Sequence, residues 1–308
     1  MFKQEQLQFG RFAFLTLLLI MLLAVAGCES ESDDIPTGPA ETVDYMVHQA
    51  WGYLDAGEID NAIEEFNRAA NAEATNLEAY LGLGYAYSKN NELVRAQLNF
   101  SNVIGLVDVL LLDPENPITQ EYADTLLAEA YAGRTAAYLA ALSYQDAITN
   151  AALCIDIWSG FSDPSHRWLE GVNLHDVRVM KANAHYGAQE FNLCMLIVDD
   201  LMDGDFITGS DQVISNTETL EVTLLQDTHV NGIAALELTN YNLIHPASIE
   251  DTAGNVAVIT GFDGAGNTIR FRANPIPAQG DQYTVVYMYA ADFGLFMVEL
   301  REALTDLE

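Results

Sequence analysis

Residues 43–76 read VDYMVHQAWGYLDAGEIDNAIEEFNRAANAEATN, and residues 77–110 read LEAYLGLGYAYSKNNELVRAQLNFSNVIGLVDVL. The two stretches align without a gap at an offset of 34 residues. Small and large apolar residues recur at this offset: Met46 and Tyr80, Ala50 and Gly84, Tyr53 and Tyr87, Ala62 and Ala96, Phe66 and Phe100. A repeat of this length, with small and aromatic residues at fixed positions, is typical of a solenoid built from helix pairs.

The two blocks resemble tetratricopeptide repeats, which carry aromatic and small residues at these same positions. The resemblance implies two antiparallel helices in each block. In the first block we expect them over residues 42–55 and 58–71, with Gly57 in the turn. Ala50 and Ala62 then lie where the two helices touch, since only small side chains fit there.

Two further blocks keep the register less well, at residues 128–161 and 175–208. Ala151 stands in the third block where an aromatic residue is expected. The period breaks over residues 111–127, where two prolines exclude a continuous helix, and Thr119 is an expected N-cap for the helix that follows. Residues 162–174 form a long loop with Trp168, which is either functional or a surface crossover.

From Ile214 onward the apolar pattern changes from a period of 3.6 to a period of 2. Short alternating runs, separated by turn clusters, predict five to six strands in an antiparallel sheet or small sandwich. Residues 292–307 then carry an apolar stripe at helical spacing. We expect this last helix to return and cap the fourth block; the alternative is that it covers one face of the sheet.

Residues 1–28 carry the pattern of a secreted chain. A positively charged start precedes an apolar run over residues 12–26, which is shorter than the ~20 residues that a spanning helix needs. The run ends in VAGC (25–28), which resembles the bacterial lipobox. The resemblance implies cleavage after Gly27, a covalent lipid on Cys28 and stable anchoring by two or three acyl chains. A plain signal peptide with a chance cysteine is the alternative.

The predicted fold class is mostly α: a right-handed tetratricopeptide solenoid of about four repeats, followed by a small antiparallel β module and a C-terminal helix. The predicted domains are a signal peptide (1–27), a lipidated cysteine with a disordered acidic tether (28–41), the solenoid (42–208), the β module (209–290) and the capping helix (291–308).

The chain has 308 residues and a formal net charge of −33, from 12 Lys and Arg against 45 Asp and Glu. Such a surface repels nucleic acid and anionic lipid, and favours a cationic partner. An adaptation to a saline setting explains the same acidity, because salt screens self-repulsion. The resemblance to bacterial lipoproteins also implies a location. Glu29, directly after Cys28, implies the outer membrane with the chain facing the periplasm, because an Asp there is the usual signal for the inner membrane; residues 32–34 resemble the acidic surface-export signals of other lipoproteins and imply the cell surface instead.

The resemblance implies that the first helices of the blocks line a concave groove. Positions 2, 5, 9 and 12 of each block share one face and predict an apolar, aromatic groove with an acidic rim. A basic or amphipathic peptide would suit it, and a carbohydrate stacked on Trp51 and Tyr85 is an alternative. Equally, these two rings pack against each other and are structural. The ligand candidates are Val47, Trp51, Leu54, Glu78, Leu81, Tyr85, Asp176 and Tyr186.

No catalytic signature is found in the sequence, and we predict that the chain is not an enzyme and needs no cofactor beyond the lipid on Cys28. Cys154 and Cys194 fall at core positions too far apart for a disulfide, so we expect two buried free thiols. An acidic cluster around Gly204 is a weak calcium candidate; the alternative is a helix end and a solvated loop. Its residues are Asp199, Asp203, Asp205 and Asp211.

These observations predict a membrane-anchored extracytoplasmic scaffold that binds a protein or peptide. The resemblance alone cannot identify the ligand, because many functions share this fold. The alternatives are a lipoprotein that captures glycans or nutrients for an outer-membrane uptake system, and a component of cell-envelope assembly.

Overall fold

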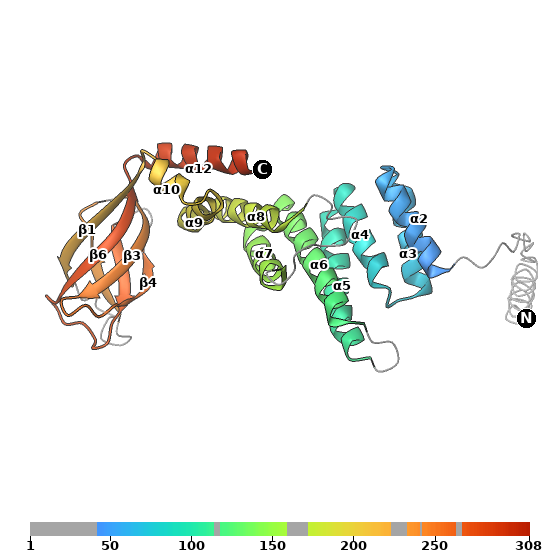
Figure 1. Cartoon of the computed structure of the whole chain (residues 1–308), viewed down its shortest axis with the longest axis horizontal. Helices are drawn as coiled ribbons and strands as arrows, with labels where there is room; N and C mark the ends of the chain where they lie inside the picture. The colour runs from blue at the N-terminus through green and yellow to red at the C-terminus, as the bar shows by residue number, and fades with distance from the viewer. Residues whose placement is uncertain (1–41, 114–117, 159–171, 223–232, 241, 263–266) are drawn as a thin grey trace, which may run out of the picture. The chain divides into compact units, whose positions relative to one another are not determined.

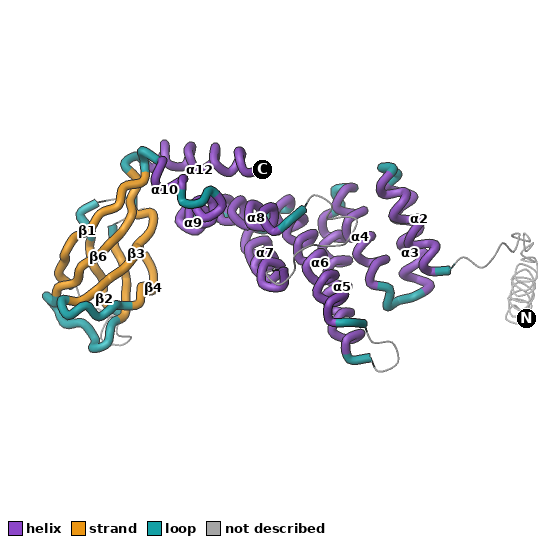
Figure 2. The backbone as a smooth tube through the Cα atoms, in the orientation of Figure 1, coloured by secondary structure: helices purple, strands orange, loops and turns teal. Residues whose placement is uncertain are grey.

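The computed structural model describes residues 42–113, 118–158, 172–222, 233–240, 242–262 and 267–308. Val43–Glu308 form one compact unit. The predicted signal peptide, lipidation site and tether lie outside the described residues, as does Trp168 in the long loop. No helix in the described ranges is long and apolar enough to cross a membrane. Figure 1 and Figure 2 show a series of helices, then strands, then a last helix.

Among the described residues, the first eight helices form four antiparallel pairs, and a short helix follows them. Each helix contacts its pair partner and the next helix along the chain. The helices are α2 (Val43–Asp55), α3 (Ile59–Ala72), α4 (Leu77–Lys89), α5 (Leu93–Leu111), α6 (Gln120–Ala140), α7 (Tyr144–Trp158), α8 (Leu174–Gly187), α9 (Phe191–Leu201) and α10 (Asp205–Gly209).

The four turns inside the pairs have the same backbone geometry, which confirms the predicted blocks. Position 15 of each block adopts a positive φ of 59° to 77°. The amide of position 16 donates to the carbonyl of position 11 at 2.8 to 2.9 Å. A left-handed residue followed by this bond is the usual way to end a helix. The residues at position 15 are Gly57, Asn91, Leu142 and Gln189.

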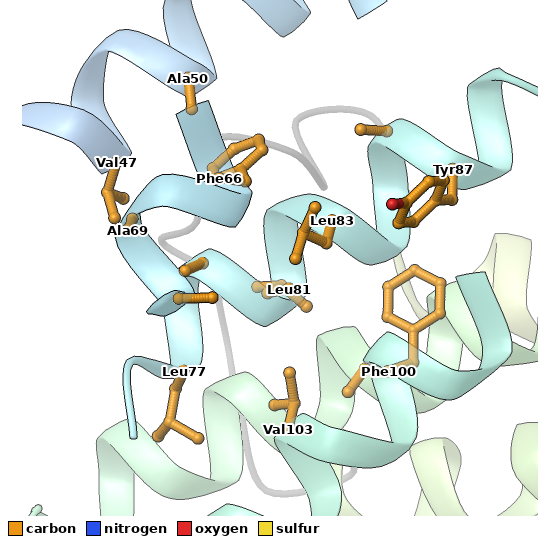
Figure 3. Close-up of a cluster of buried hydrophobic side chains, with 14 of the residues drawn as sticks. Val47, Ala50, Phe66, Ala69, Leu77, Leu81, Leu83, Tyr87, Phe100 and Val103 are labelled. Carbon is orange, nitrogen blue, oxygen red and sulfur yellow. The ribbon is translucent and has the colours of Figure 1, made fainter. Parts of the chain in front are cut away.

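At the first two junctions between helix pairs, an aromatic ring packs against a glycine of the next pair. Figure 3 shows Phe66 and Phe100 among the buried side chains of the first two repeats. A Cβ at Gly82 would lie 2.2 Å from the Phe66 ring, and one at Gly133 would lie 2.4 Å from the Phe100 ring. Both glycines stand at position 6 of the next block, so the ring of each repeat occupies the space of a side chain missing from the following one.

The third junction reverses these sizes, which explains the unexpected Ala151. Position 6 of the fourth block is Met180 rather than glycine. Ala151 is fully buried, and Met180 packs against the same apolar cluster. A small residue therefore replaces the ring on one side, while a long flexible one replaces the glycine on the other. Total side-chain volume, rather than the aromatic itself, is what this position requires.

The 17 extra residues between the second and third blocks mostly lengthen two helices. The period breaks over residues 111–127 as predicted: α5 ends at Leu111, and α6 begins at Gln120. These helices have 19 and 21 residues, against 11 to 15 in the other six helices of the four pairs. Thr119 is the N-cap of α6 as predicted, since its hydroxyl accepts from the Tyr122 amide at 3.2 Å.

The described part of the β module forms two three-stranded antiparallel sheets. One has the order β1-β6-β3 and the other the order β2-β5-β4. Alternate residues of both sheets, including the fully buried Tyr287 and Phe271, share one apolar cluster. The predicted small sandwich is therefore present. Its strands are β1 (Val213–Glu221), β2 (Ala234–Glu237), β3 (Leu243–Asp251), β4 (Val258–Phe262), β5 (Thr268–Arg272) and β6 (Gln282–Ala290).

The last helix, α12 (Phe293–Leu307), packs against α8 and α9. Asp292 begins it as an N-cap that accepts from the amides of Gly294 and Leu295. Phe296, Leu300 and Leu304 are buried in one cluster with residues of α8, α9, β3 and β6. This position is what capping of the fourth repeat requires. Whether α12 stabilises the repeats stays a prediction, and it is tested below.

Candidate functional site

A cleft of about 520 Å³ lies beside α8, between the α6–α7 turn and the C-terminal half of α12. This volume is in the range of small-ligand sites. The lining combines aliphatic, aromatic and charged side chains. The lining residues are Leu139, Leu142, Tyr144, Asp176, Val179, Met180, Asn183, Tyr186, Gly187, Arg301, Leu307 and Glu308.

The cleft lies on the face that the sequence predicted to be concave. Asp176, Val179, Asn183 and Tyr186 are positions 2, 5, 9 and 12 of the fourth block, and all four line it. Leu139 is position 12 of the third block. The helical periodicity therefore located this part of the site. Among the ligand candidates named from sequence, Asp176 and Tyr186 are the two that the structure places in the cleft.

Another wall of the cleft comes from α12; the packing of this helix on the fourth repeat was predicted, but its contribution to a site was not. Asn183 joins α12 to α8: its Oδ1 accepts from Arg301 Nη1 at 3.1 Å, and its Nδ2 donates to Glu308 Oε1 at 3.0 Å. The Arg301 guanidinium also lies 5.8 Å from the centre of the Tyr186 ring, a cation–π distance. A wall built by a segment more than 100 residues away leaves no local sequence signal.

Asp176 has a structural role at the edge of the cleft. Its Oδ2 accepts from the Asn173 amide at 2.7 Å, and the Asn173 side chain accepts from the amides of His175 and Asp176. This is a capping box, which satisfies free amides at the start of α8. The carboxylate nevertheless adds negative charge to the cleft, opposite in sign to Arg301.

Four of the predicted groove residues are part of the core instead. Val47, Trp51, Leu54 and Leu81 are at most 5% exposed, so they offer almost no surface to a ligand. The Trp51 ring packs edge-on against Phe66 at 4.9 Å and lies 6.3 Å from Tyr85. The structural alternative for Trp51 and Tyr85 thus describes their contact, and a sugar-stacking surface made of these two rings is not available.

Tyr85 and Glu78 also face neighbouring helices. Burial, reinforced by the Glu129 carboxylate, raises the pKa of the Tyr85 hydroxyl well above its ordinary value. Glu78 Oε1 accepts from the Tyr122 hydroxyl at 3.3 Å. Burial and this carboxylate raise the pKa of Tyr122 as well. Both tyrosines therefore stay protonated, and the lengthened start of α6 covers the predicted acidic rim of the second block.

The acidic residues around Gly204 do not form a calcium site, which corrects that hypothesis for Asp199, Asp203, Asp205 and Asp211. In the described ranges no group of three or more His, Cys, Asp or Glu side chains could hold a metal ion. Asp199 Oδ1 instead accepts from the Ile207 amide at 2.8 Å. Asp203 and Gly204 have positive φ values of 55° and 87° and end α9, as the helix-end alternative expects.

Cys154 and Cys194 are buried free thiols, as predicted. They lie on α7 and α9, the second helices of the third and fourth pairs. Burial raises the pKa of the Cys154 thiol to about 12. It raises the pKa of Cys194 to about 12 as well, against a small opposing effect of Arg301. Neither thiol is therefore a nucleophile at neutral pH.

Comparison with known proteins assigns the chain to no family. No protein-family model matches the chain, and no curated protein matches it. The structure of the apo form of RapI is similar with a TM-score of 0.43 and 12% identity, over 68% of this chain and 70% of that one. The TPR2AB domain of yeast Sti1, solved in a complex with pHSP90, has a TM-score of 0.21 and 14% identity, over 54% and 79%.

Both TM-scores lie below 0.5, so neither likeness supports an argument by itself. Features of the structure itself assign the fold. These are the four helix pairs, the four equivalent turns and the junctions at which an aromatic ring packs against a glycine of the next repeat. These features define a tetratricopeptide-like helical repeat fold with a β module and a C-terminal helix.

Proposed function

We propose that this chain is a membrane-anchored, extracytoplasmic scaffold that binds a segment of another protein in the cleft between the third repeat, the fourth repeat and α12. The observation that carries the proposal is the cleft itself, on the predicted concave face. Its size suits a few residues of a peptide chain rather than a folded domain. Repeated helices supply a rigid frame on which such a site is held in place.

The composition of the lining supports binding rather than catalysis. The two carboxylates that line the cleft are held by hydrogen bonds within the chain: Asp176 accepts from the Asn173 amide, and Glu308 accepts from Asn183 Nδ2. Among the described residues, neither is paired with a second reactive group, as acid–base or nucleophilic catalysis requires. Apolar side chains with a few polar groups around them instead provide affinity and orientation.

The acidic surface supports a basic or amphipathic partner segment. The net charge of −33 attracts positive charge over the whole chain and raises the association rate with cationic partners. Glycan capture by stacking on Trp51 and Tyr85 is not supported, since the Trp51 ring packs against Phe66 and Tyr85. A role in cell-envelope assembly is compatible with the proposal, because it too requires a protein partner.

Two leucines on α12 provide a matched test of the cleft. Leu307 lines it, whereas Leu295 is 53% exposed outside it. Photo-cross-linking first identifies the partner. A photoreactive group at Asn183, in the cleft, should cross-link in intact cells to a protein that the same group at the exposed Leu98 on α5 does not capture. Leu307→Glu should then weaken binding of that partner's peptide about tenfold or more, because a charge enters an apolar contact. Leu295→Glu should bind like the parent chain.

Equal affinities of the two variants would exclude the cleft as the binding site. If no peptide from any cross-linked partner binds the parent chain, the scaffold proposal itself fails. Circular dichroism should show that both variants retain the parent's helical content, so that a binding loss is not a folding loss.

Membrane anchoring is a separate part of the proposal and depends on Cys28. The lipobox-like residues at 25–28 support it, since two acyl chains suffice for stable attachment. The full chain produced in a bacterium should enter the detergent phase of a Triton X-114 extract, and Cys28→Ala should move it to the aqueous phase. Recovery of the parent chain in the aqueous phase would exclude lipidation. The proposed location is the outer membrane facing the periplasm, and protease accessibility of whole cells separates this from the cell surface.

A further inference from the structure

Leu142 is an exposed leucine in a left-handed backbone conformation. It is position 15 of the third block, in the turn between α6 and α7, and its φ is +59°. Glycine and asparagine occupy this position in the first two repeats, as Gly57 and Asn91. These two residue types adopt the left-handed conformation most easily, whereas a bulky side chain is disfavoured there.

Leu142 does not contribute its side chain to the core. It is 68% exposed, so burial of apolar surface cannot offset the unfavourable backbone conformation. Its backbone meets the needs of the turn without any particular side chain: the amide donates to the Leu139 carbonyl at 3.0 Å. Neither the turn nor the packing of the repeats therefore explains a leucine.

The side chain lies instead at the rim of the cleft. Leu142 lines it beside three half-buried apolar residues from three different elements. A residue held in an unfavourable conformation with its apolar side chain at the mouth of a binding cleft is a common sign of a functional contact. The three neighbours are Leu139 on α6, Met180 on α8 and Leu307 on α12.

We propose that Leu142 determines the specificity of the cleft, and that the bound segment is an amphipathic peptide whose apolar side chain packs against Leu142, with basic residues flanking it. This deepens the proposed function and rests on it. Burial of the exposed leucine by the ligand gives affinity. Two carboxylates of the cleft, from Asp176 and Glu308, favour basic flanks. The Arg301 guanidinium is already directed to Asn183 and the Tyr186 ring.

The repeats contain an internal control for backbone strain. Gln189 is position 15 of the fourth block, has a φ of +63° and does not line the cleft. Leu142→Asn and Gln189→Asn both introduce the residue that the second repeat uses. Each should raise the melting temperature by about 2 °C through relief of the left-handed strain. Only Leu142→Asn should lose binding.

The probe is an array of 15-residue peptides of systematically varied sequence, exposed to the full chain, with titration of the best-bound peptide in solution. We expect bound peptides to share an apolar residue between Lys or Arg residues. Leu142→Asn should weaken the titrated peptide about tenfold, whereas Gln189→Asn should leave its affinity unchanged.

Three results would overturn the inference. In the first, the bound peptides share acidic residues in place of an apolar one. In the second, Leu142→Asn binds the peptide as tightly as the parent chain. In the third, Leu142→Asn lowers the melting temperature by several degrees while Gln189→Asn does not, which would make Leu142 a packing residue. The Leu307→Glu variant distinguishes a failure of the cleft as the binding site from a failure of the role proposed for Leu142. If it abolishes binding and Leu142→Asn does not, the cleft stands and Leu142 is not its determinant. If no peptide on the array binds, both proposals fail.

Discussion

The first two repeats and the last two repeats follow the same backbone plan but use different side chains. In the first half, Phe66 and Phe100 fill the junctions against glycines of the next block, and the face of the first helices is sealed by Trp51 and Tyr85. In the second half, Ala151 and Met180 replace ring and glycine. The equivalent face remains partly open as the cleft.

This difference shows that repeat regularity and ligand binding are separate properties here. The regular half uses Trp51, Phe66 and Phe100 to pack helices together, so these buried rings are not available to a partner. The irregular half departs from the repeat pattern and leaves space beside α8. Two residues that break the repeat pattern, Leu142 and Met180, line the cleft, whereas the rings that keep the pattern lie in the core.

Loss of a junction ring should have the largest effect on stability. Phe100→Ala removes a fully buried ring between Gly84 and Gly133, and no nearby side chain can fill the space. We expect the free energy of unfolding to fall by about 4 kcal/mol. Urea denaturation followed by circular dichroism measures it. A loss below about 1 kcal/mol would mean that the junction closes around the cavity.

The capping role of α12 is expected to give the next largest effect. Leu300 is fully buried against α9 and the end of the β module, so Leu300→Ala should cost about 3 kcal/mol. The exposed Leu295→Ala on the same helix should cost at most about 0.5 kcal/mol. Hydrogen exchange should show the loss of protection in α8 and α9 but not in α2–α4. Uniform loss along the chain would contradict a local cap.

At the third junction the small and the large side chain have changed places, and this allows a double-mutant test. Ala151→Phe restores the ring of the earlier repeats but overfills the space beside Met180, and should cost about 2 kcal/mol. Met180→Gly made together with it recreates the earlier junction, so the pair should be more stable than the sum of the single changes predicts. Additive losses, measured by urea denaturation, would show that the two side chains do not share this space.

A pH effect at the fourth repeat is expected to be the smallest of the four. His185 is buried at position 11, where the other blocks have Tyr53, Tyr87 and Tyr138. Burial lowers its pKa, and this outweighs the opposing hydrogen bond and charge of Glu190. The folded state therefore favours the neutral ring. Its contribution is complete above the unfolded pKa of about 6.5 and is lost as pH falls through the lower folded pKa.

His185→Tyr should accordingly reduce the fall in melting temperature between pH 7 and pH 5. His245 on β3 has a pKa lowered by burial in the same direction, so a smaller slope should remain. An unchanged slope in His185→Tyr would assign the effect to His245 or to other groups.

More of the fold than of the candidate site could be predicted from the sequence. The four blocks, the turn positions, the Thr119 cap, the strands and the final helix were predictable, because each depends on neighbours within a few turns of helix or one strand pair. The extent of α5 and α6 was not, since only packing of the two helices on each other decides how far they continue. Periodicity placed Asp176 and Tyr186 on the face of the cleft. Trp51, also a ligand candidate, lies in the core instead, as the packing alternative expects.

The sequence by itself determined the repeat register and the residue types at each turn, including the leucine at position 142 that departs from glycine and asparagine. Only the tertiary structure decided which of the predicted concave residues are accessible. Exposure depends on what packs over a side chain, and here the covering elements are distant in sequence: Phe66 and Tyr85 over Trp51, the start of α6 beside Glu78, and α12 across from Asn183. Helical periodicity places a residue on a face, and long-range packing then makes that face a core or a cleft.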